Sequence, residues 1–396
     1  MGYRNLMKPP VAVWAVATVA SRLPVAMAPL AFVFFAKGTP GGYGLGAVLA
    51  AAYTLAEAAG APVLGTRLGT RPMHRELSIG IAVSAVALGG FTLSTSAPAA
   101  VTVVLAVIAG AAGAAAPGGL RTMAARLVDE ADVPAMLSFE AVLNQSVWAL
   151  APAVTGVLAL GVAPSVPFAV AAGSAALAAV LVPMLPKQSA TARPEQPQGS
   201  PARMLWSVWP IYLTSAAAMY LLATVELALP ALLEHRGVAV GWAGPLLTGF
   251  AVASIAGGIV YGLRAWPGSH RTRSLVLLVL IAALVGMVGL SPWPAGIAAG
   301  LLLSGLLQAA LLVSRNLSLR DRLPEHTHAA GYSLMYAASG IGYGASGVAI
   351  GAVLAADTPV LGVLAGAGVT VVLALVSAFA EARTARLGPA PAQEHP

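Results

Sequence analysis

Long apolar stretches follow one another along the chain, separated by short segments that hold most of its charged and polar residues. A helix that crosses a lipid bilayer needs about 20 apolar residues, and twelve stretches reach this length. They cover residues 10–36, 42–64, 77–96, 99–120, 136–161, 164–186, 205–233, 240–263, 274–291, 294–315, 329–355 and 359–381. They are continuous and too long for outer-membrane barrel strands, which alternate over about ten residues. The pattern therefore predicts an all-α integral membrane protein with twelve transmembrane helices.

Composition supports this interpretation, because 58% of the residues are hydrophobic and only 9% are charged. Soluble domains carry about 25% charged residues, and disordered chains combine high charge with low hydrophobicity, so both classes are excluded. The chain has no cysteine, which excludes disulfides, iron–sulfur clusters and cysteine-ligated zinc. Every histidine falls in a predicted loop or tail, so we expect no metal site and no cofactor.

The positive charges lie on alternate turns of the predicted bundle. If the N-terminus, with Arg4 and Lys8, is cytoplasmic, the even-numbered turns and the C-terminal tail are cytoplasmic too. These segments hold Arg67, Arg71, Arg75, Arg121, Arg126, Lys187, Arg193, Arg203, Arg264, Arg271, Arg273, Arg320, Arg322, Arg383 and Arg386. The outer turns hold only Lys37 and Arg236. The positive-inside rule therefore predicts two cytoplasmic termini in the cytoplasmic membrane of a bacterium. It also accounts for the net charge of +7, so no nucleic-acid partner is expected.

A segment rich in Pro, Gln, Ser and charge divides the chain into two similar halves. The predicted parts are an N-terminal six-helix bundle at 1–186, a cytoplasmic linker at 187–203, a C-terminal six-helix bundle at 204–384 and a cytoplasmic tail at 385–396. At an offset of about 200 residues, Pro230 aligns with Pro29 and Gly237 falls on Gly38. Two pseudo-symmetric bundles are typical of a duplicated transporter whose site lies between the halves near the midplane.

Several segments resemble known transporters. They are SRLPVAMAPLAF in the first predicted helix, APGGLRTMAARL at the end of the fourth, ALAPAVTG in the fifth, and VELALPALLEHRG with LLTGFAVASIAGGIVYG in the seventh and eighth. In these segments the chain resembles the major facilitator superfamily, and within it the twelve-helix drug:proton antiporters that include actinobacterial efflux permeases. The resemblance implies the major facilitator fold and proton-coupled export. The loop between the second and third helices departs from that family's signature, because it lacks the acidic residue and has Met73 in place of the second glycine; we assign its Arg67 and Arg71 to gating.

Charged side chains inside the predicted helices are few, and each costs at least about 2.5–3.5 kcal/mol at mid-bilayer. We assign Arg22, Glu57 and Glu226 to proton coupling. A carboxyl without a counter-ion in an apolar setting favours its neutral form, as a proton-coupling site requires. Alternatively, Glu57 forms a structural ion pair with Arg22 on the neighbouring helix; the two roles are compatible. For Glu226, the alternative to a role in a central cavity is a structural hydrogen bond to a neighbouring helix.

The fifth predicted helix places Glu140, Asn144 and Trp148 at i, i+4 and i+8, so that they share one face, with Gln145 beside them. Trp148 lies in the middle of the helix, where it stacks on a substrate or packs between helices. Glu140 lies near the cytoplasmic end, and we favour a gate or tether with Arg121 or Arg126 over substrate contact.

The eleventh predicted helix carries a polar and aromatic face, formed by Tyr332, Tyr336, Ser339, Tyr343 and Ser346. We expect this face to line the cavity opposite the fifth helix. The predicted substrate-binding residues are Tyr53, Asn144, Gln145, Trp148, Met219, Gln308, Tyr332, Tyr336 and Ser339.

These candidates predict a secondary-active transporter that works by alternating access. The few charges and many aromatic and apolar side chains favour proton-coupled export of a small amphiphilic compound, drug-like or antibiotic-like. The alternative is a proton-coupled importer of a small polar nutrient such as a sugar, an amino acid or an organic acid. We expect no enzymatic activity, because no catalytic constellation is present. The expected partners are the substrate, protons and membrane lipid, and we expect a monomer.

Overall fold

The computed structural model describes residues 6, 8–37, 39, 42–69, 71–93, 97–186, 200–355 and 359–386. All regular secondary structure in this part of the chain is helical. Most of the predicted linker, residues 187–199, and the predicted tail from residue 387 lie outside the described residues.

The helices form two groups, which we call the N-half and the C-half. The N-half contains α1 (Pro9–Lys37), α2 (Gly42–Leu68), α3 (Met73–Leu93), α4 (Ala99–Gly113), α5 (Ala116–Arg126), α6 (Val133–Gly161) and α7 (Val166–Leu181). The C-half contains α8 (Pro201–Ser207), α9 (Trp209–His235), α10 (Ala243–Leu263), α11 (His270–Leu290), α12 (Pro294–Arg322), α13 (His328–Ala355) and α14 (Pro359–Arg386). Short 3₁₀ turns are η2 (Glu130–Asp132), η3 (Val182–Met184), η4 (Val240–Trp242) and η5 (Glu325–Thr327).

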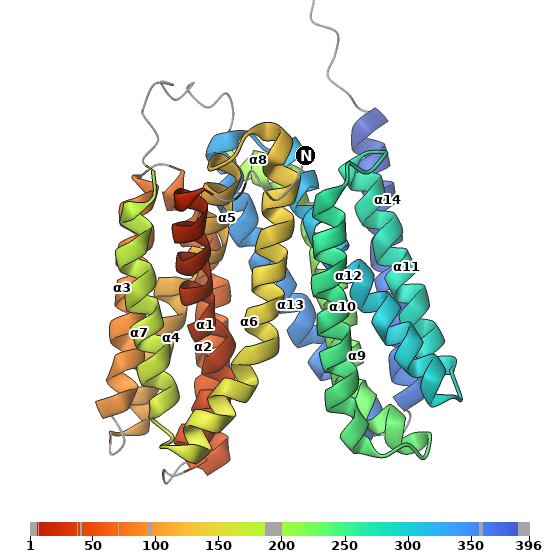
Figure 1. Cartoon of the computed structure of the whole chain (residues 1–396), viewed down its shortest axis with the longest axis horizontal. Coiled ribbons are helices and arrows are strands. Elements are labelled where there is room, and N and C mark those ends of the chain that lie inside the picture. Colours follow the sequence, from red (N-terminus) through yellow and green to blue (C-terminus); the bar gives the residue numbers. More distant parts are fainter. Residues whose placement is uncertain are drawn as a thin grey trace, which may run out of the picture.

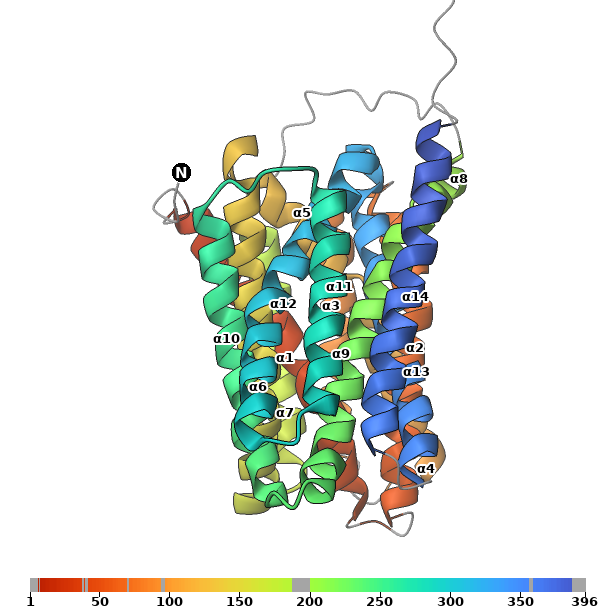
Figure 2. The ribbon, with the colours of Figure 1, turned by 90° about the vertical axis from the view of Figure 1, so that its right-hand side faces the viewer.

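The two halves stand side by side, with α6 and α13 between them (Figure 1). A view from the side of α11 and α14 shows that the axes of the long C-half helices lie roughly parallel to one another (Figure 2). Eleven segments of described residues are long and apolar enough to cross a membrane, α4 and α5 counting as one, and α13 supplies a further crossing. The predicted all-α fold with twelve crossing helices is confirmed.

Two helices are interrupted where one continuous helix was predicted. The fourth crossing turns at Ala114 and Ala115, between α4 and α5. Pro117 lies in the first turn of α5 and has no N–H to bond to the carbonyl group of Gly113, so the regular bonding stops there. Likewise the predicted helix 205–233 is divided at Val208, because Pro210 lies in the first turn of α9, which begins at Trp209.

Each half has its own core. In the N-half, Phe32, Phe35, Phe91 and Phe168 form a cluster of edge-on and stacked rings, with the Phe91 and Phe168 centroids 4.7 Å apart. In the C-half the corresponding cluster is aliphatic, with Leu229, Leu278 and Val285 at its centre. The cores of the two halves therefore consist of different side chains, and a further buried cluster, with Leu137 and Val313 among its members, lies between the halves.

Matching glycine crossings show that the halves are repeats. In the N-half, Gly110 of α4 packs against the backbone carbonyl group of Tyr53 in α2. In the C-half, Gly305 of α12, 195 residues later, packs in the same way against Phe250 in α10, where an added Cβ would lie 2.5 Å from the carbonyl oxygen. Small residues allow such close approach of helices. These glycine contacts hold α2 against α4 and α10 against α12.

Candidate functional site

The halves pack across their interface in a crossed pattern. α13 of the C-half packs against α2 and α5, and α6 of the N-half packs against α10 and α12. The sequence predicts that the fifth and eleventh crossings, α6 and α13, face each other across the cavity. At the interface, each of them packs on two other helices of the opposite half. We call the end of the bundle where α5 ends and α6 begins the closed end, and the opposite end the open end.

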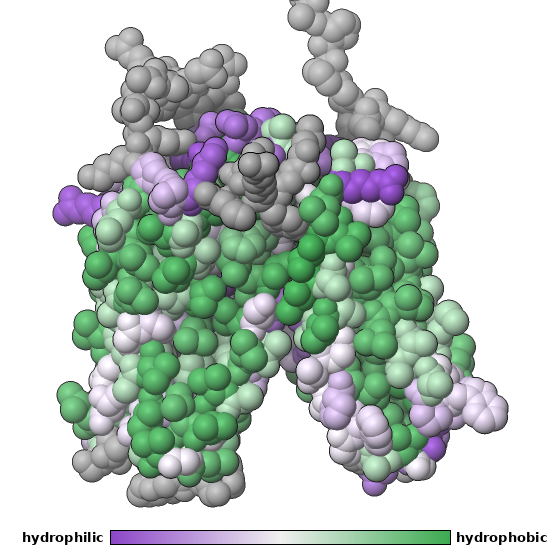
Figure 3. Space-filling view, viewed as in Figure 1, coloured by the Kyte–Doolittle hydropathy of each residue, from purple (hydrophilic) through white to green (hydrophobic). Residues whose placement is uncertain are grey.

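Exposure changes abruptly along the two interface helices. No residue from 133 to 147 of α6 is exposed, whereas most residues from 148 to 161 are. α13 shows the same change, because none of residues 328–339 is exposed but residues 340, 341 and 343–345 are. The space-filling view shows the halves separated by a hollow at the open end and joined at the closed end (Figure 3). A crevice between the halves therefore opens on one side only.

A buried ion network lies beneath the crevice, on the side of the closed end. Arg22 of α1 donates to the carboxylate of Glu140 and to the amide oxygen of Asn144, both on α6. Arg121 of α5 donates to the same carboxylate through two bonds of 2.8 and 3.0 Å. Glu140 is 1% exposed and bridges two guanidinium groups. The predicted tether between Glu140 and Arg121 is therefore present.

Arg22 does not pair with Glu57, contrary to the alternative that we derived from the sequence. The guanidinium group of Arg22 bonds to α6, where the i, i+4 spacing of Glu140 and Asn144 places both acceptors on one face. Glu57 is buried on α2 and bonds to the hydroxyl group of Tyr336 on α13. Its Oε1 atom has no hydrogen-bond partner among the described residues.

The tyrosine face of α13 contacts both halves. Tyr332 lies under the guanidinium group of Arg121, 5.5 Å from its ring centre, and its hydroxyl group donates to the Asn316 carbonyl oxygen at 3.3 Å. Closer to the open end, the Tyr343 hydroxyl group donates to Glu226 of α9 at 2.8 Å. The predicted face therefore exists, but its members bond to protein groups at different depths.

Two ion pairs join the halves at the closed end, and we call them the latch. Arg126 at the end of α5 pairs with Glu325 of η5 at 3.0 Å. Arg320 of α12 pairs with Glu130 of η2, with one bond of 2.7 Å. Arg126, which we assign to gating from the sequence, has its ion-pair partner here. The other three residues of the latch were not predicted from the sequence. Their signal was present, because an arginine is followed by a glutamate four or five residues later in both equivalent loops.

The other predicted gating arginines lie on the N-half alone. Arg71 pairs with Glu76 of α3 at 3.4 Å, and its side chain is 59% exposed. Arg67 is exposed in the last turn of α2. The Arg71 pair does not cross the interface, so this residue does not join the halves.

The remaining predicted substrate-binding residues are dispersed. The ring of Tyr53 packs on Phe32 inside the N-half and the residue is 3% exposed, so it does not line the crevice in this conformation. Gln308 is buried, with an Nε2 atom that has no partner among the described residues. Trp148 is 44% exposed at the point where the crevice opens. Intermediate exposure is found for Asn144, Gln145, Met219, Tyr336 and Ser339.

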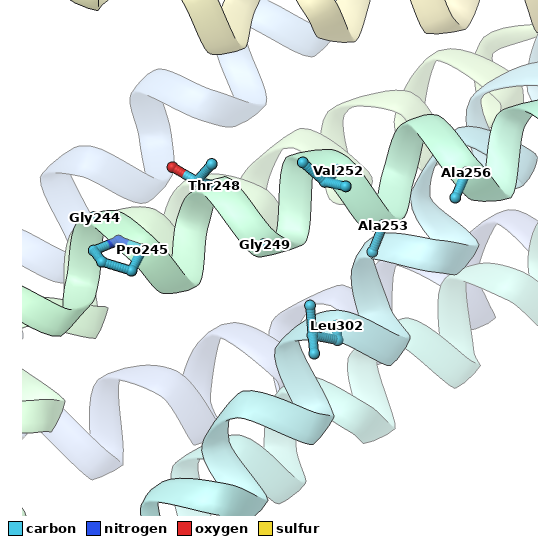
Figure 4. A pocket seen from close by; sticks show the side chains of 8 residues that line it. All are labelled: Gly244, Pro245, Thr248, Gly249, Val252, Ala253, Ala256 and Leu302. Carbon is cyan, nitrogen blue, oxygen red and sulfur yellow. The ribbon is translucent and has the colours of Figure 1, made fainter.

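An apolar groove of about 760 Å³ lies elsewhere, on the exposed side of α10 beside α12. Gly249, Val252 and Leu302 are among its lining residues, and Thr248 is its one hydroxyl-bearing side chain (Figure 4). None of the charged residues described above lines it, so we place the candidate site in the crevice. No group of three or more metal-ligating side chains was found among the described residues.

Comparisons with known proteins agree with this architecture. Residues 14–294, more than half of the chain, match the model of the Major Facilitator Superfamily. A search of curated proteins finds no significant match. Among solved structures, the E. coli fucose:proton symporter FucP is similar at a TM-score of 0.75 and 14% identity, covering 95% of this chain and 99% of that one.

Two other similar structures have TM-scores of 0.70. The human organic anion transporter MFSD10 is 16% identical, and the match covers 94% of this chain and all of that one. A bacterial homologue of the iron transporter ferroportin, in its outward-facing state, is 14% identical, with the same coverage of both chains. At these identities the likeness concerns the fold.

Proposed function

Because the chain belongs to the Major Facilitator Superfamily and is a multi-pass membrane transporter, not an enzyme, we propose that it exports a small amphiphilic organic compound in exchange for protons. One observation carries the proton coupling. The carboxyl group of Glu57 lies buried between the halves and bonds across the interface to Tyr336, without a basic partner among the described residues.

This arrangement couples the protonation of Glu57 to contact between the two halves. A neutral carboxyl group is tolerated in an apolar interface, whereas the carboxylate favours water or a stronger donor set. Loss of the proton therefore favours a conformation that hydrates Glu57. Glu226 forms a similar bond with Tyr343, within the C-half and nearer the open end, where Tyr343 is 38% exposed and water reaches the pair.

The crevice walls favour an amphiphilic substrate. Tyr343 and Trp148 are exposed at the depth where the crevice opens, on helices that also carry exposed aliphatic residues such as Ile341 and Leu150. Aromatic and aliphatic walls with a few polar groups bind amphiphilic organic molecules well. Alternating access would carry such a molecule from one side to the other as the halves rock.

Coupling is tested with everted membrane vesicles, an imposed proton gradient and a panel of amphiphilic dyes. We expect Glu57→Gln to lose gradient-driven accumulation but to retain exchange of dye at equal concentrations, because only the proton site is removed. Glu76→Gln is the matched control, since this glutamate is in an exposed pair of the same half. If Glu57→Gln still accumulates dye with unchanged pH dependence, the coupling role of Glu57 is refuted.

We also propose that the closed end faces the cytoplasm of a bacterium. Arg67, Arg126, Arg203 and Arg320 lie at this end, and Arg236 lies at the other. The absence of native cysteine makes single-cysteine labelling possible. A cysteine at Gly237 should react with a membrane-impermeant maleimide in intact cells, and one at Ala202 should react only after lysis. The reverse result contradicts this orientation.

A further inference from the structure

Arg315 of α12 is a buried cation without a carboxylate partner. It is 2% exposed, and its Nη1 atom donates to the Thr214 carbonyl oxygen of α9 at 2.9 Å. The Nε atom has no partner, and no salt bridge of Arg315 occurs among the described residues. A buried charge that lacks a counter-ion costs several kcal/mol, so a purely structural role explains Arg315 poorly.

Comparison of the two repeats shows which partner Arg315 lacks. Arg121 precedes Arg315 by 194 residues, the same offset that relates the latch residues Arg126 and Arg320. In the N-half, Glu140 binds Arg121 through two hydrogen bonds. The loop that follows is one residue longer in the C-half, because the latch residues Glu130 and Glu325 are 195 residues apart, so Met335 corresponds to Glu140 and packs among apolar neighbours. One copy of the repeat thus carries an arginine and its carboxylate, and the other carries only the arginine.

The surroundings of Arg315 are also cationic. Arg315 lies close enough to Arg121 for their charges to interact, and Arg121 interacts likewise with Arg22. Glu140 is the one carboxylate among the described residues that pairs with any of these three arginines. The cluster therefore has an excess of positive charge, next to the aromatic ring of Tyr332.

We propose that the transported compound carries a carboxylate and that Arg315, with Arg121 beside it, binds this group when the closed end opens. The proposal rests on the proposed transport function and names its substrate class. Glu140 on Arg121 is an internal example of the interaction, because guanidinium groups bind carboxylates through paired, charge-assisted hydrogen bonds. Tyr332 supplies apolar contact for the rest of an amphiphilic acid. In the present conformation Arg315 bonds to Thr214 instead, as expected after release towards the open end.

The test is a binding measurement on the purified full chain in detergent. The probes are 1-naphthoate and its neutral analogue 1-naphthamide, and the readout is the concentration of each that half-maximally raises the unfolding temperature. We expect wild type to bind the acid more tightly than the amide. Arg315→Gln should weaken naphthoate binding at least about tenfold and leave naphthamide binding unchanged, because only the charged hydrogen bonds are lost. Arg322→Gln, on an exposed arginine of the same helix, should match wild type.

A second variant supplies the missing carboxylate and does not depend on removing Arg315. Met335→Glu should weaken naphthoate binding by a similar factor, because the new side chain competes for Arg315, whereas Met335→Gln should not. The proposal is overturned if Arg315→Gln and Met335→Glu both bind naphthoate like wild type. It is also overturned if phosphatidylglycerol raises the unfolding temperature through Arg315 and naphthoate does not, which would identify a lipid site. Binding requires no proton gradient, so failure of proton-driven transport with intact naphthoate binding would contradict the proposed coupling alone.

Discussion

Replacing Glu140 with glutamine removes the carboxylate that holds two arginines of different helices together. The Arg121 Nη2 and Glu140 Oε1 atoms are 2.8 Å apart, and Glu140 is 1% exposed. At an effective dielectric constant of about 20, charges at this distance attract by about 6 kcal/mol before desolvation is subtracted. Removing one member of a buried pair costs about 3–5 kcal/mol, because the remaining charges stay buried. We expect Glu140→Gln to lower the unfolding free energy by about this amount.

The measurement is unfolding by SDS in mixed micelles, with a double-mutant cycle for Arg22→Leu and Glu140→Gln. Residues in contact should show a coupling energy of about 0.5–3 kcal/mol, whereas a parallel cycle for Arg22 and Glu57 should be additive within about 0.5 kcal/mol. Glu76→Gln, in an exposed pair, should change stability by less than about 1 kcal/mol. A cycle in which Arg22 couples to Glu57 and not to Glu140 would refute the network.

Two further predictions concern packing and the latch. Gly342→Ala should lower the unfolding free energy by about 1–3 kcal/mol, because a Cβ there would collide with the α9 backbone; Gly340→Ala, with open space around it, should change it little. Equal effects of the two substitutions would contradict the packing. Arg126→Glu should shift spin-label distances at the closed end towards a more open population, and adding Glu325→Arg should reverse the shift; no reversal would show that this pair does not join the halves.

Hydropathy predicted the helices well because the bilayer imposes one long apolar segment per crossing. The same signal runs through the break between α4 and α5, since small apolar residues lie on both sides of Pro117. Hydropathy is an average over many residues, so it does not register the one backbone hydrogen bond that a single proline removes. The break was therefore visible only in the structure.

The candidate site was predicted in part. The spacing of Glu140 and Asn144 correctly indicated a shared polar face, because helix periodicity is local. The partner of Arg22 was not predictable, since it depends on which neighbouring helix lies nearest, and both Glu57 and Glu140 were compatible with the pattern. Tyr53 shows the same limit: it lies one turn from Glu57, yet its ring packs on Phe32.

The glycine crossings have a mechanical consequence. Gly110 on Tyr53 and Gly305 on Phe250 bring backbones into contact, so bending either half would separate closely packed main chains. The latch joins the halves through side chains that are partly in water, with Glu130 79% and Glu325 66% exposed, and such pairs contribute about 0–1 kcal/mol each. At the same end the seam is also close-packed, since an added Cβ on Gly118 of α5 would lie 2.8 Å from the Ala329 carbonyl oxygen of α13. The packed part of the seam stops where the crevice begins, so it forms a hinge at the closed end about which each half can turn as a unit, with its own helix crossings unchanged.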